Sequence, residues 1–202
     1  MSNASFFFSV YIKFFFIMTP FFVASVFLSM TKGIEENEKK RLSIKVTLAI
    51  AVACMIVLYF GKYIFELFGI TLDAFRIGAG ALLFLTAVDL VQKDVNTEVT
   101  CKGDIAKHTV VPLAIPITVG PGTVGALMVM GAEMKSIMDV TIGSLALLSA
   151  IVCVGFMLYL SGSIERVMGK SGLIVLSKVT GLILSALSAQ IIFTGIKNFL
   201  HT

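Results

Sequence analysis

Charged side chains are scarce in this sequence. Asp, Glu, Lys and Arg make up 14% of its 202 residues, whereas an ordinary soluble domain carries about 25%. Hydrophobic residues make up 57%, and the mean hydropathy is +1.00. A single soluble core cannot bury that much apolar surface, so the composition predicts a protein whose partner is the lipid bilayer.

Cysteine is also rare, and its count is odd. Two of the three cysteines, Cys54 and Cys153, fall inside apolar runs, so a disulfide framework is not expected and all three are interpreted as reduced. Cys101 shares a short polar segment with Asp104 and His108. These three lack a fourth ligand at metal spacing, and we predict no metal site and no cofactor.

Groupings of residues that would indicate an enzyme or a nucleic-acid-binding protein are missing as well. The apolar runs contain no Ser with His, no paired aspartates and no HExxH motif, so we predict that the chain is not an enzyme. The net charge is +4, but the basic residues lie between apolar runs instead of alternating with aromatics along a stripe. Nucleic acid is therefore not expected as a partner.

Long runs without Asp, Glu, Lys or Arg mark the candidate membrane helices, each of which needs roughly 20 mostly apolar residues. The third run reaches this length only if Ala74 to Val91 spans, with Arg76 and Asp89 near its ends. We therefore predict an all-α polytopic membrane protein with six transmembrane helices. The runs are Phe14–Thr31, Val46–Gly61, Ile77–Val88, Thr109–Ala132, Val140–Ile164 and Val179–Ile196.

The distribution of Lys and Arg predicts the orientation. The segments after the first, third and fifth helices carry ten of these residues, against four on the other side. The first segment includes Lys32 to Arg41, interpreted as a solvated loop, and the third includes Arg166 and Lys170. Because basic loops stay in the cytoplasm, both termini should be extracytoplasmic.

The two halves of the chain resemble each other. A shift of 102 residues sets Arg76–Val91 against Lys178–Phe193, and a shift of 101 sets Thr19-Pro20 against Gly120-Pro121. We interpret residues 1–202 as one transmembrane domain: repeat one at about 5–92, a cytoplasmic loop at about 93–107, and repeat two at about 108–199. Three helices per repeat is an odd number, so the second copy must be inverted. Chance similarity between apolar helices is the alternative.

All four prolines fall in the first and fourth predicted helices, which are equivalent under the repeat. Proline removes a backbone N–H and clashes with the preceding turn. We therefore predict two discontinuous helices, with non-helical backbone around Met18–Thr19 and at Val119–Gly122. The fourth helix should stop near Thr118 and restart at Pro121. The prolines are Pro20, Pro112, Pro116 and Pro121.

Each restart should leave unpaired N–H groups and the positive end of a helix dipole inside the membrane. Unpaired backbone is tolerated there only where it lines a cavity or is packed in protein. Two such helix starts facing each other would bind an anionic group such as a carboxylate. Proline kinks without a ligand are the alternative. The predicted substrate-binding residues are Thr19, Pro20, Phe21, Phe22, Gly120, Pro121, Gly122 and Thr123.

Three further residues are candidates for coupling or gating. Asp89 is the one acid within an apolar run and could relay a proton or pair with Lys178, although an interfacial carboxylate is the simpler interpretation. Gln190 lies deeper and could touch substrate or serve only in helix packing.

Three stretches, Ala74–Val91, Val111–Thr123 and Lys170–Ile196, resemble the MarC-like integral membrane proteins, which are also grouped as neutral amino acid transporters. "PLAIP" followed by "GPG" is the most specific element. The resemblance implies two inverted repeats, a bacterial or archaeal inner membrane, and transport of small neutral amino acids. The chain departs from the family at Thr19, where Asn is usual, and at the bulky Phe21 and Phe22.

We therefore expect a secondary transporter of small neutral amino acids such as alanine or glycine, an exporter or an importer, working by alternating access. A membrane scaffold or assembly protein without transport activity is the alternative. Self-association into a homo-oligomer is compatible with either function.

Overall fold

The computed structural model describes residues 3–92, 113–134 and 136–200. Within these ranges the chain is all helical, with seven α-helices, one short π-helix and no strand. The elements are α1 (Asn3–Ile17), α2 (Pro20–Met30), α3 (Glu36–Phe68), α4 (Leu72–Gln92), η1 (Leu113–Thr118), α7 (Pro121–Glu133), α8 (Ile137–Tyr159) and α9 (Ser161–Leu200).

Five described stretches are long and apolar enough to cross a membrane: Asn3–Met30, Glu36–Gly61, Leu72–Gln92, Ile137–Tyr159 and Ser161–Leu200. They cover five of the six helices predicted from the sequence. The remaining one, Thr109–Ala132, begins outside the described residues, and its described part is η1 followed by α7.

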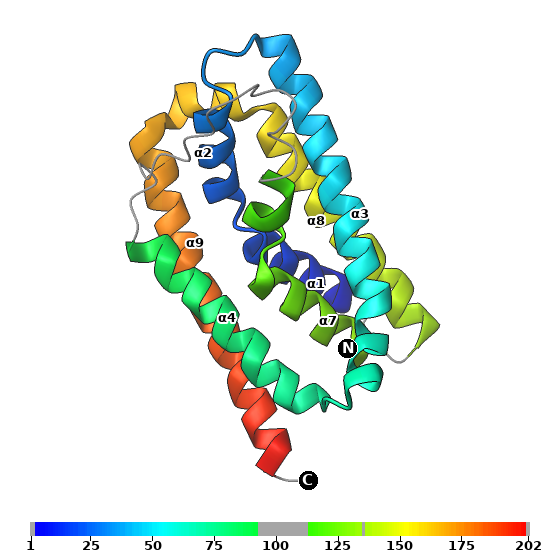
Figure 1. Ribbon diagram of the computed structural model, residues 1–202. Coiled ribbons are helices and arrows are strands. Elements are labelled where there is room, and N and C mark those ends of the chain that lie inside the picture. The colour runs from blue at the N-terminus through cyan, green and yellow to red at the C-terminus, as the bar shows by residue number, and fades with distance from the viewer. Residues whose placement is uncertain (1–2, 93–112, 135, 201–202) are drawn as a thin grey trace.

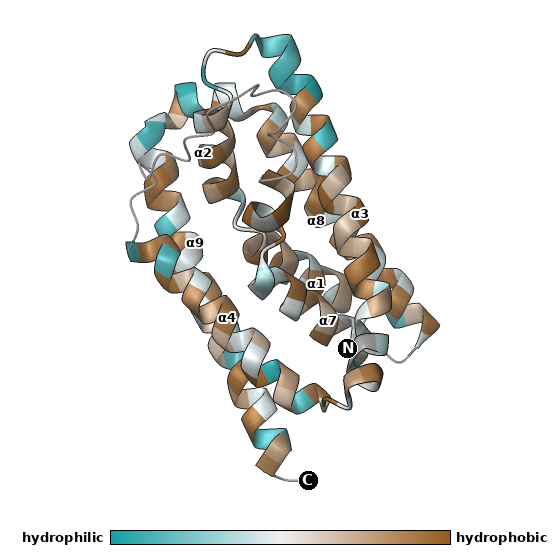
Figure 2. Cartoon of the chain, viewed as in Figure 1, coloured by the Kyte–Doolittle hydropathy of each residue, from teal (hydrophilic) through white to brown (hydrophobic). Residues whose placement is uncertain are grey.

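The helices run back and forth along one direction (Figure 1). We define the lower end as the end where α3, α7 and α9 finish and α4 and α8 begin. At the upper end α2 and α8 finish and α3 and α9 begin (Figure 1). Hydrophilic residues gather where α3 and α9 begin, whereas the middles of the helices are mostly hydrophobic (Figure 2). This distribution suits a bundle with its middle in lipid.

The outer face of α3 is a continuous apolar stripe. Ile44, Leu48, Val52 and Ile56 recur every four residues, and more than half of the surface of each is exposed. Residues spaced by four lie on one face of a helix. Such an apolar stripe is costly in water and favourable against acyl chains.

Helix packing inside the bundle depends on small residues. α4 lies along α9 and also contacts α7, while α2 packs on α9 and α3 packs on α7 and α8. A Cβ atom added at Gly80 would lie 3.1 Å from the Ser188 carbonyl oxygen, and one at Gly181 would lie 3.1 Å from that of Ala87. Glycine at these crossings therefore lets the backbones of α4 and α9 approach closely.

α3 begins ten residues before the predicted start at Val46, so most of the expected solvated loop is helical. Glu36 and Glu38 lie in its first turn, where acidic groups interact favourably with the helix dipole. Lys39 pairs with Glu36 at 3.4 Å. The charges that suggested a loop instead form the polar, helical end of α3.

The loop predicted around Arg166 and Lys170 is also wrong, because α9 continues through it. The only interruption is at Gly169, whose φ of 68° and ψ of 169° leave the helical region. Glycine takes positive φ without steric cost, so it can turn the chain there. A short helix therefore replaces the loop, and the chain turns at Gly169 into the long segment that packs on α4.

Candidate functional site

The first break in helical backbone lies between α1 and α2, at Met18 and Thr19. Thr19 has φ 47° and ψ 57°, and it is the only described non-glycine residue with positive φ. A β-branched side chain is rare in this left-handed region, and the residue before a proline normally adopts extended backbone. Thr19 is 4% exposed, so packing holds this strained conformation inside the protein.

The second break lies between η1 and α7, at Val119 and Gly120. Ile115, which precedes Pro116, has φ −139° and ψ 121°, and Gly120, which precedes Pro121, has φ −80° and ψ 175°. Both follow the preference of a residue before proline for extended backbone. η1 ends at Thr118 and α7 begins at Pro121, as the prolines and glycines predicted. Gly122, expected to be non-helical, is helical.

Both restarts leave backbone donors free. Thr19 and Gly120 are the N-caps, Pro20 and Pro121 follow them, and neither N-cap contributes a side-chain hydrogen bond. Among the described residues, no backbone carbonyl accepts from the N–H of Phe21 or Phe22, or from that of Gly122 or Thr123. The first paired amides are Val23 and Val124, which bond to Thr19 and Gly120 at 3.0 and 2.9 Å.

The break regions lie together in the middle of the bundle, since α2 contacts η1 (Figure 1). Thr118 and Thr123 are both buried. The Thr118 hydroxyl donates to the Leu113 carbonyl at 2.7 Å, and the Thr123 hydroxyl donates to the Thr118 carbonyl at 3.3 Å. The two hydroxyls therefore satisfy carbonyls that the broken helix exposes. Thr123 was predicted as a possible ligand contact, and Thr118 was overlooked.

Gly122 packs against another helix. A Cβ atom added to it would lie 2.9 Å from the Cα of Leu83 on α4. Three residues on, one added to Gly125 would lie 2.6 Å from the Cβ of Ala79. Gly122 is thus required for close contact between α7 and α4, and bulk introduced there would separate two helices before it reached a ligand.

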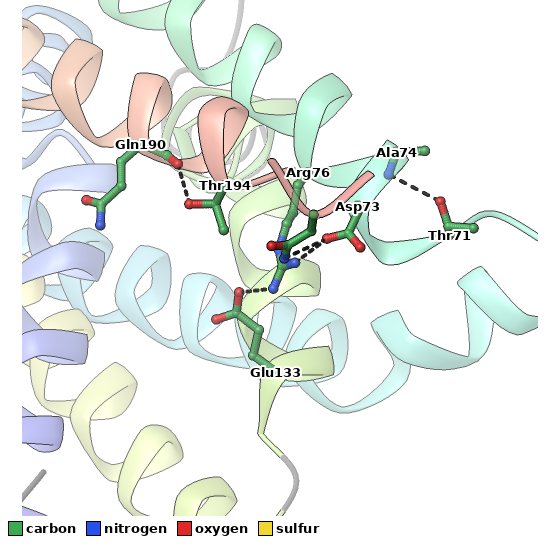
Figure 3. A network of polar contacts seen from close by, with 8 residues as sticks. Thr71, Asp73, Ala74, Arg76, Glu133, Gln190 and Thr194 are labelled. Carbon is green, nitrogen blue, oxygen red and sulfur yellow. Dashed lines mark hydrogen bonds and ion pairs between the residues drawn. The ribbon is translucent and has the colours of Figure 1, made fainter. Parts of the chain in front are cut away.

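A cavity of about 230 Å³ lies on the lower side of the first break, between α1, α4, α7 and α9. We call it the lower cavity. Its polar and charged lining consists of Lys13, Arg76, Glu133, Gln190 and Thr194, and Ile17 at the end of α1 also borders it. The coupling candidate Gln190 lines the same cavity as Arg76 and Glu133, and its backbone carbonyl accepts a hydrogen bond from the Thr194 hydroxyl (Figure 3).

Arg76 is the centre of this charged group. Its guanidinium donates to Asp73 on α4 and, at 2.5 Å, to Oε1 of Glu133 at the end of α7 (Figure 3). Asn198 on α9 donates to the same Asp73 oxygen at 3.3 Å. The network connects three helices at the lower end. From the sequence, Arg76 was predicted only to lie near the end of a span, because its partner Glu133 is 57 positions away.

A second cavity, of about 600 Å³, lies at the upper end where α2 finishes beside the start of α9. We call it the upper cavity. Its lining includes Ser25, Leu28, Ser29, Lys32 and Glu165. The two other gating candidates do not line either cavity: Asp89 is exposed in the last turn of α4, and Lys178 is half-buried on α9. A pairing between them stays a prediction. Cys101, Asp104 and His108 lie outside the described residues.

The sequence was also compared with known proteins. The model of the MarC family integral membrane proteins matches residues 4–200. A UPF0056 membrane protein of Methanocaldococcus jannaschii is 32% identical over 97% of this chain and 89% of its own length. The UPF0056 membrane protein YhcE of Escherichia coli K12 is 30% identical over 98% of this chain and 96% of its own length. No solved structure matches.

The family match extends along both halves of the chain, so its residue range covers the two breaks, Arg76 and the residues that line both cavities. The relatives come from bacteria and archaea and are named only as membrane proteins. This chain belongs to the MarC family of integral membrane proteins.

Proposed function

We propose that the protein is a secondary transporter of small neutral amino acids such as glycine or alanine, and not an enzyme. The observation that carries the proposal is the pair of helix starts at Pro20 and Pro121, each with two amides that donate to no backbone carbonyl in the described part of the chain. Unpaired backbone at membrane depth needs a cavity or a ligand, and a carboxylate is the group that helix starts bind best.

The packing supports an inverted repeat of three helices, in which α2 corresponds to α7, α3 to α8 and α4 to α9. α2 packs on α9 just as α7 packs on α4, and the two related pairs α3 with α8 and α4 with α9 pack on each other. In such repeats, substrate sites lie at broken helices where the two halves meet. We propose that α1 with α2, and η1 with α7, are the two discontinuous helices.

The cavities support the same relation. Ala126, Val129, Met130 and Glu133 on α7 line the lower cavity. A shift of 101 residues takes them to Ser25, Leu28, Ser29 and Lys32, and all four of these line the upper cavity. Two cavities on equivalent faces of equivalent helices, opening to opposite ends, are what alternating access requires. Each would be the path to the breaks in one of two conformations.

The test is counterflow of radiolabelled glycine and alanine by purified protein in liposomes. Parental protein should exchange at least one of them. Gly120→Leu should abolish exchange, because Leu fills the turn between η1 and α7. Thr19→Val should weaken binding by a factor of about 2 to 13 if the hydroxyl contributes one hydrogen bond of about 0.5–1.5 kcal/mol.

A scaffold or assembly protein is the competing function. It would not require free amides at two symmetric helix starts. If the parental protein exchanges no neutral amino acid in liposomes, while Gly120→Leu is as folded as the parent, the scaffold function becomes the better one. The proposed location is the cytoplasmic membrane of a bacterium or archaeon, with both termini extracytoplasmic.

A further inference from the structure

The lower cavity contains charges that the helix breaks do not explain. Lys13 lies on α1 four residues before the helix ends, between Ile12 and Phe14, in a stretch long and apolar enough to cross a membrane. Ionisable residues inside membrane helices are costly and usually serve a function. Lys13 lines the cavity, and it has no hydrogen-bond acceptor or ion-pair partner among the described residues. A cation in this position needs a counter-charge.

Glu133 is the acid that lines the same cavity, and it is only partly used. Its Oε1 accepts from Arg76, while no described group donates to Oε2, and the side chain is 46% exposed. Arg76 is nearly buried and held on its other side by Asp73. Two carboxylates therefore hold Arg76 in position, and Arg76 in turn holds Glu133 through the contact drawn in Figure 3. Glu133 lines the cavity.

The charges of these four residues balance: Lys13 and Arg76 are offset by Asp73 and Glu133. They are nevertheless divided, because Arg76 contacts both carboxylates and Lys13 contacts neither. A ligand with a net charge would leave an excess charge beside the nearly buried Arg76, which is unfavourable. A zwitterion would instead place an anion on Lys13 and a cation on Glu133 with no net change.

We propose that the lower cavity is a binding site for the zwitterionic form of a small neutral amino acid. The carboxylate binds the Lys13 ammonium, the ligand's ammonium binds Glu133, and Arg76 is a positioning residue that orients Glu133. Gln190 and Thr194 supply an amide and a hydroxyl on the α9 side. The volume, about 230 Å³, lies below the roughly 300–1,000 Å³ typical of sites for drug-sized ligands, which favours a small molecule.

The position of the cavity gives the site its role. It is bordered by Ile17, the last residue of α1, and Met18 next to it begins the first break. An amino acid bound here would therefore lie beside the end of α1, next to the first break. The site therefore rests on the proposed transport function. Substrate would bind there, on the lower, extracytoplasmic side, before it reaches the breaks or after it leaves them.

Equilibrium binding of radiolabelled alanine to purified full-length protein in detergent tests the site, with acetate and methylamine as single-charge competitors. In the parental protein both should compete, because each occupies one half of the site. Lys13→Gln should lower alanine affinity about tenfold or more and remove competition by acetate. Glu133→Gln should lower it similarly and remove competition by methylamine.

Matched variants separate binding from folding. Glu36→Gln breaks the exposed Lys39–Glu36 pair at the upper end and should leave affinity unchanged. Arg76→Lys should retain binding that Arg76→Gln loses, since a cation can still hold Glu133. Thermal midpoints of every variant are compared with the parent, and Lys13→Met replaces Lys13→Gln if the latter does not fold.

The results distinguish this inference from the transport proposal. The cavity site is overturned if folded Lys13 and Glu133 variants bind alanine with unchanged affinity and unchanged competition. That result would not contradict the proposed transport through the breaks. Binding that needs both residues, in a protein that shows no counterflow, supports the site and contradicts transport. Absence of alanine binding to the parental protein overturns the cavity site.

Discussion

At the scale of single residues, Thr19 shows both what the sequence predicts and what it does not. It was predicted from the sequence as an N-cap before Pro20, and it holds that position. Its left-handed backbone could not be predicted, because the usual N-cap is extended and accepts hydrogen bonds through its side chain. The surrounding packing decides the conformation here, and strained backbone of this kind tends to be found at functional sites.

This strain predicts a gain of stability on substitution. Left-handed backbone costs an L-residue about 1–2 kcal/mol, and Gly and Asn tolerate it best. Thr19→Gly and Thr19→Asn should therefore each increase the free energy of unfolding by about 1 kcal/mol. The thermal midpoint measured in detergent should rise accordingly. Thr141→Gly, on the exposed face of α8, is the control and should lower it. A Thr19→Gly protein less stable than the parent would contradict the strain argument.

At the scale of elements, local signals in the sequence predicted some boundaries and missed others. The stop at Thr118 and the restart at Pro121 follow from proline geometry, which is a property of neighbouring residues. α4 begins at Leu72, close to the prediction, because Thr71 caps it: its hydroxyl accepts from the Ala74 amide at 3.3 Å. The helix through Lys170 was missed, since charged residues alone do not end a helix.

The contact between α7 and α4 gives an element-scale prediction. Gly122→Ala and Gly125→Ala should both lower the thermal midpoint, because each new methyl would meet Leu83 or Ala79 at 3 Å or less and overpacking costs about 1–3 kcal/mol. Gly78→Ala on α4 is the matched control. Nothing lies within 4 Å of its new methyl, so it should stabilise by about 0.5–1 kcal/mol. Equal stability of all three variants would show that the helices adjust freely.

At the scale of the whole molecule, membrane helices and an orientation could be predicted from the sequence. The lower cavity could not be predicted from it. The cavity is lined by α1, α4, α7 and α9, which are widely separated in the chain. Arg76 and Glu133 are 57 positions apart, and no local spacing connects them. The similarity of the two halves was visible in the sequence, but the sequence could not predict that positions related by the 101-residue shift line two cavities.

The orientation is testable with a single cysteine. In a protein that lacks Cys54 and Cys153, Cys101 should react with a membrane-impermeant thiol reagent only after the cells are opened, because it follows the third predicted helix on the Lys-rich side. A cysteine introduced at Ser2 should react in intact cells. Labelling of Cys101 from outside would reverse the assignment of both cavities.

The proposed alternating access also makes a whole-molecule prediction, because it would couple the two cavities. Ser29 in the upper cavity and Met130 in the lower cavity are equivalent under the 101-residue shift. Single cysteines at these positions, in a protein without native cysteines, should show thiol-labelling rates that alanine changes in opposite directions. A ligand shifts such an equilibrium only through its different affinities for the two states. A cysteine at Glu38, exposed on α3, should not respond. If alanine protects Ser29→Cys and Met130→Cys together, it closes both cavities at once, and a rocking exchange between them is not the mechanism.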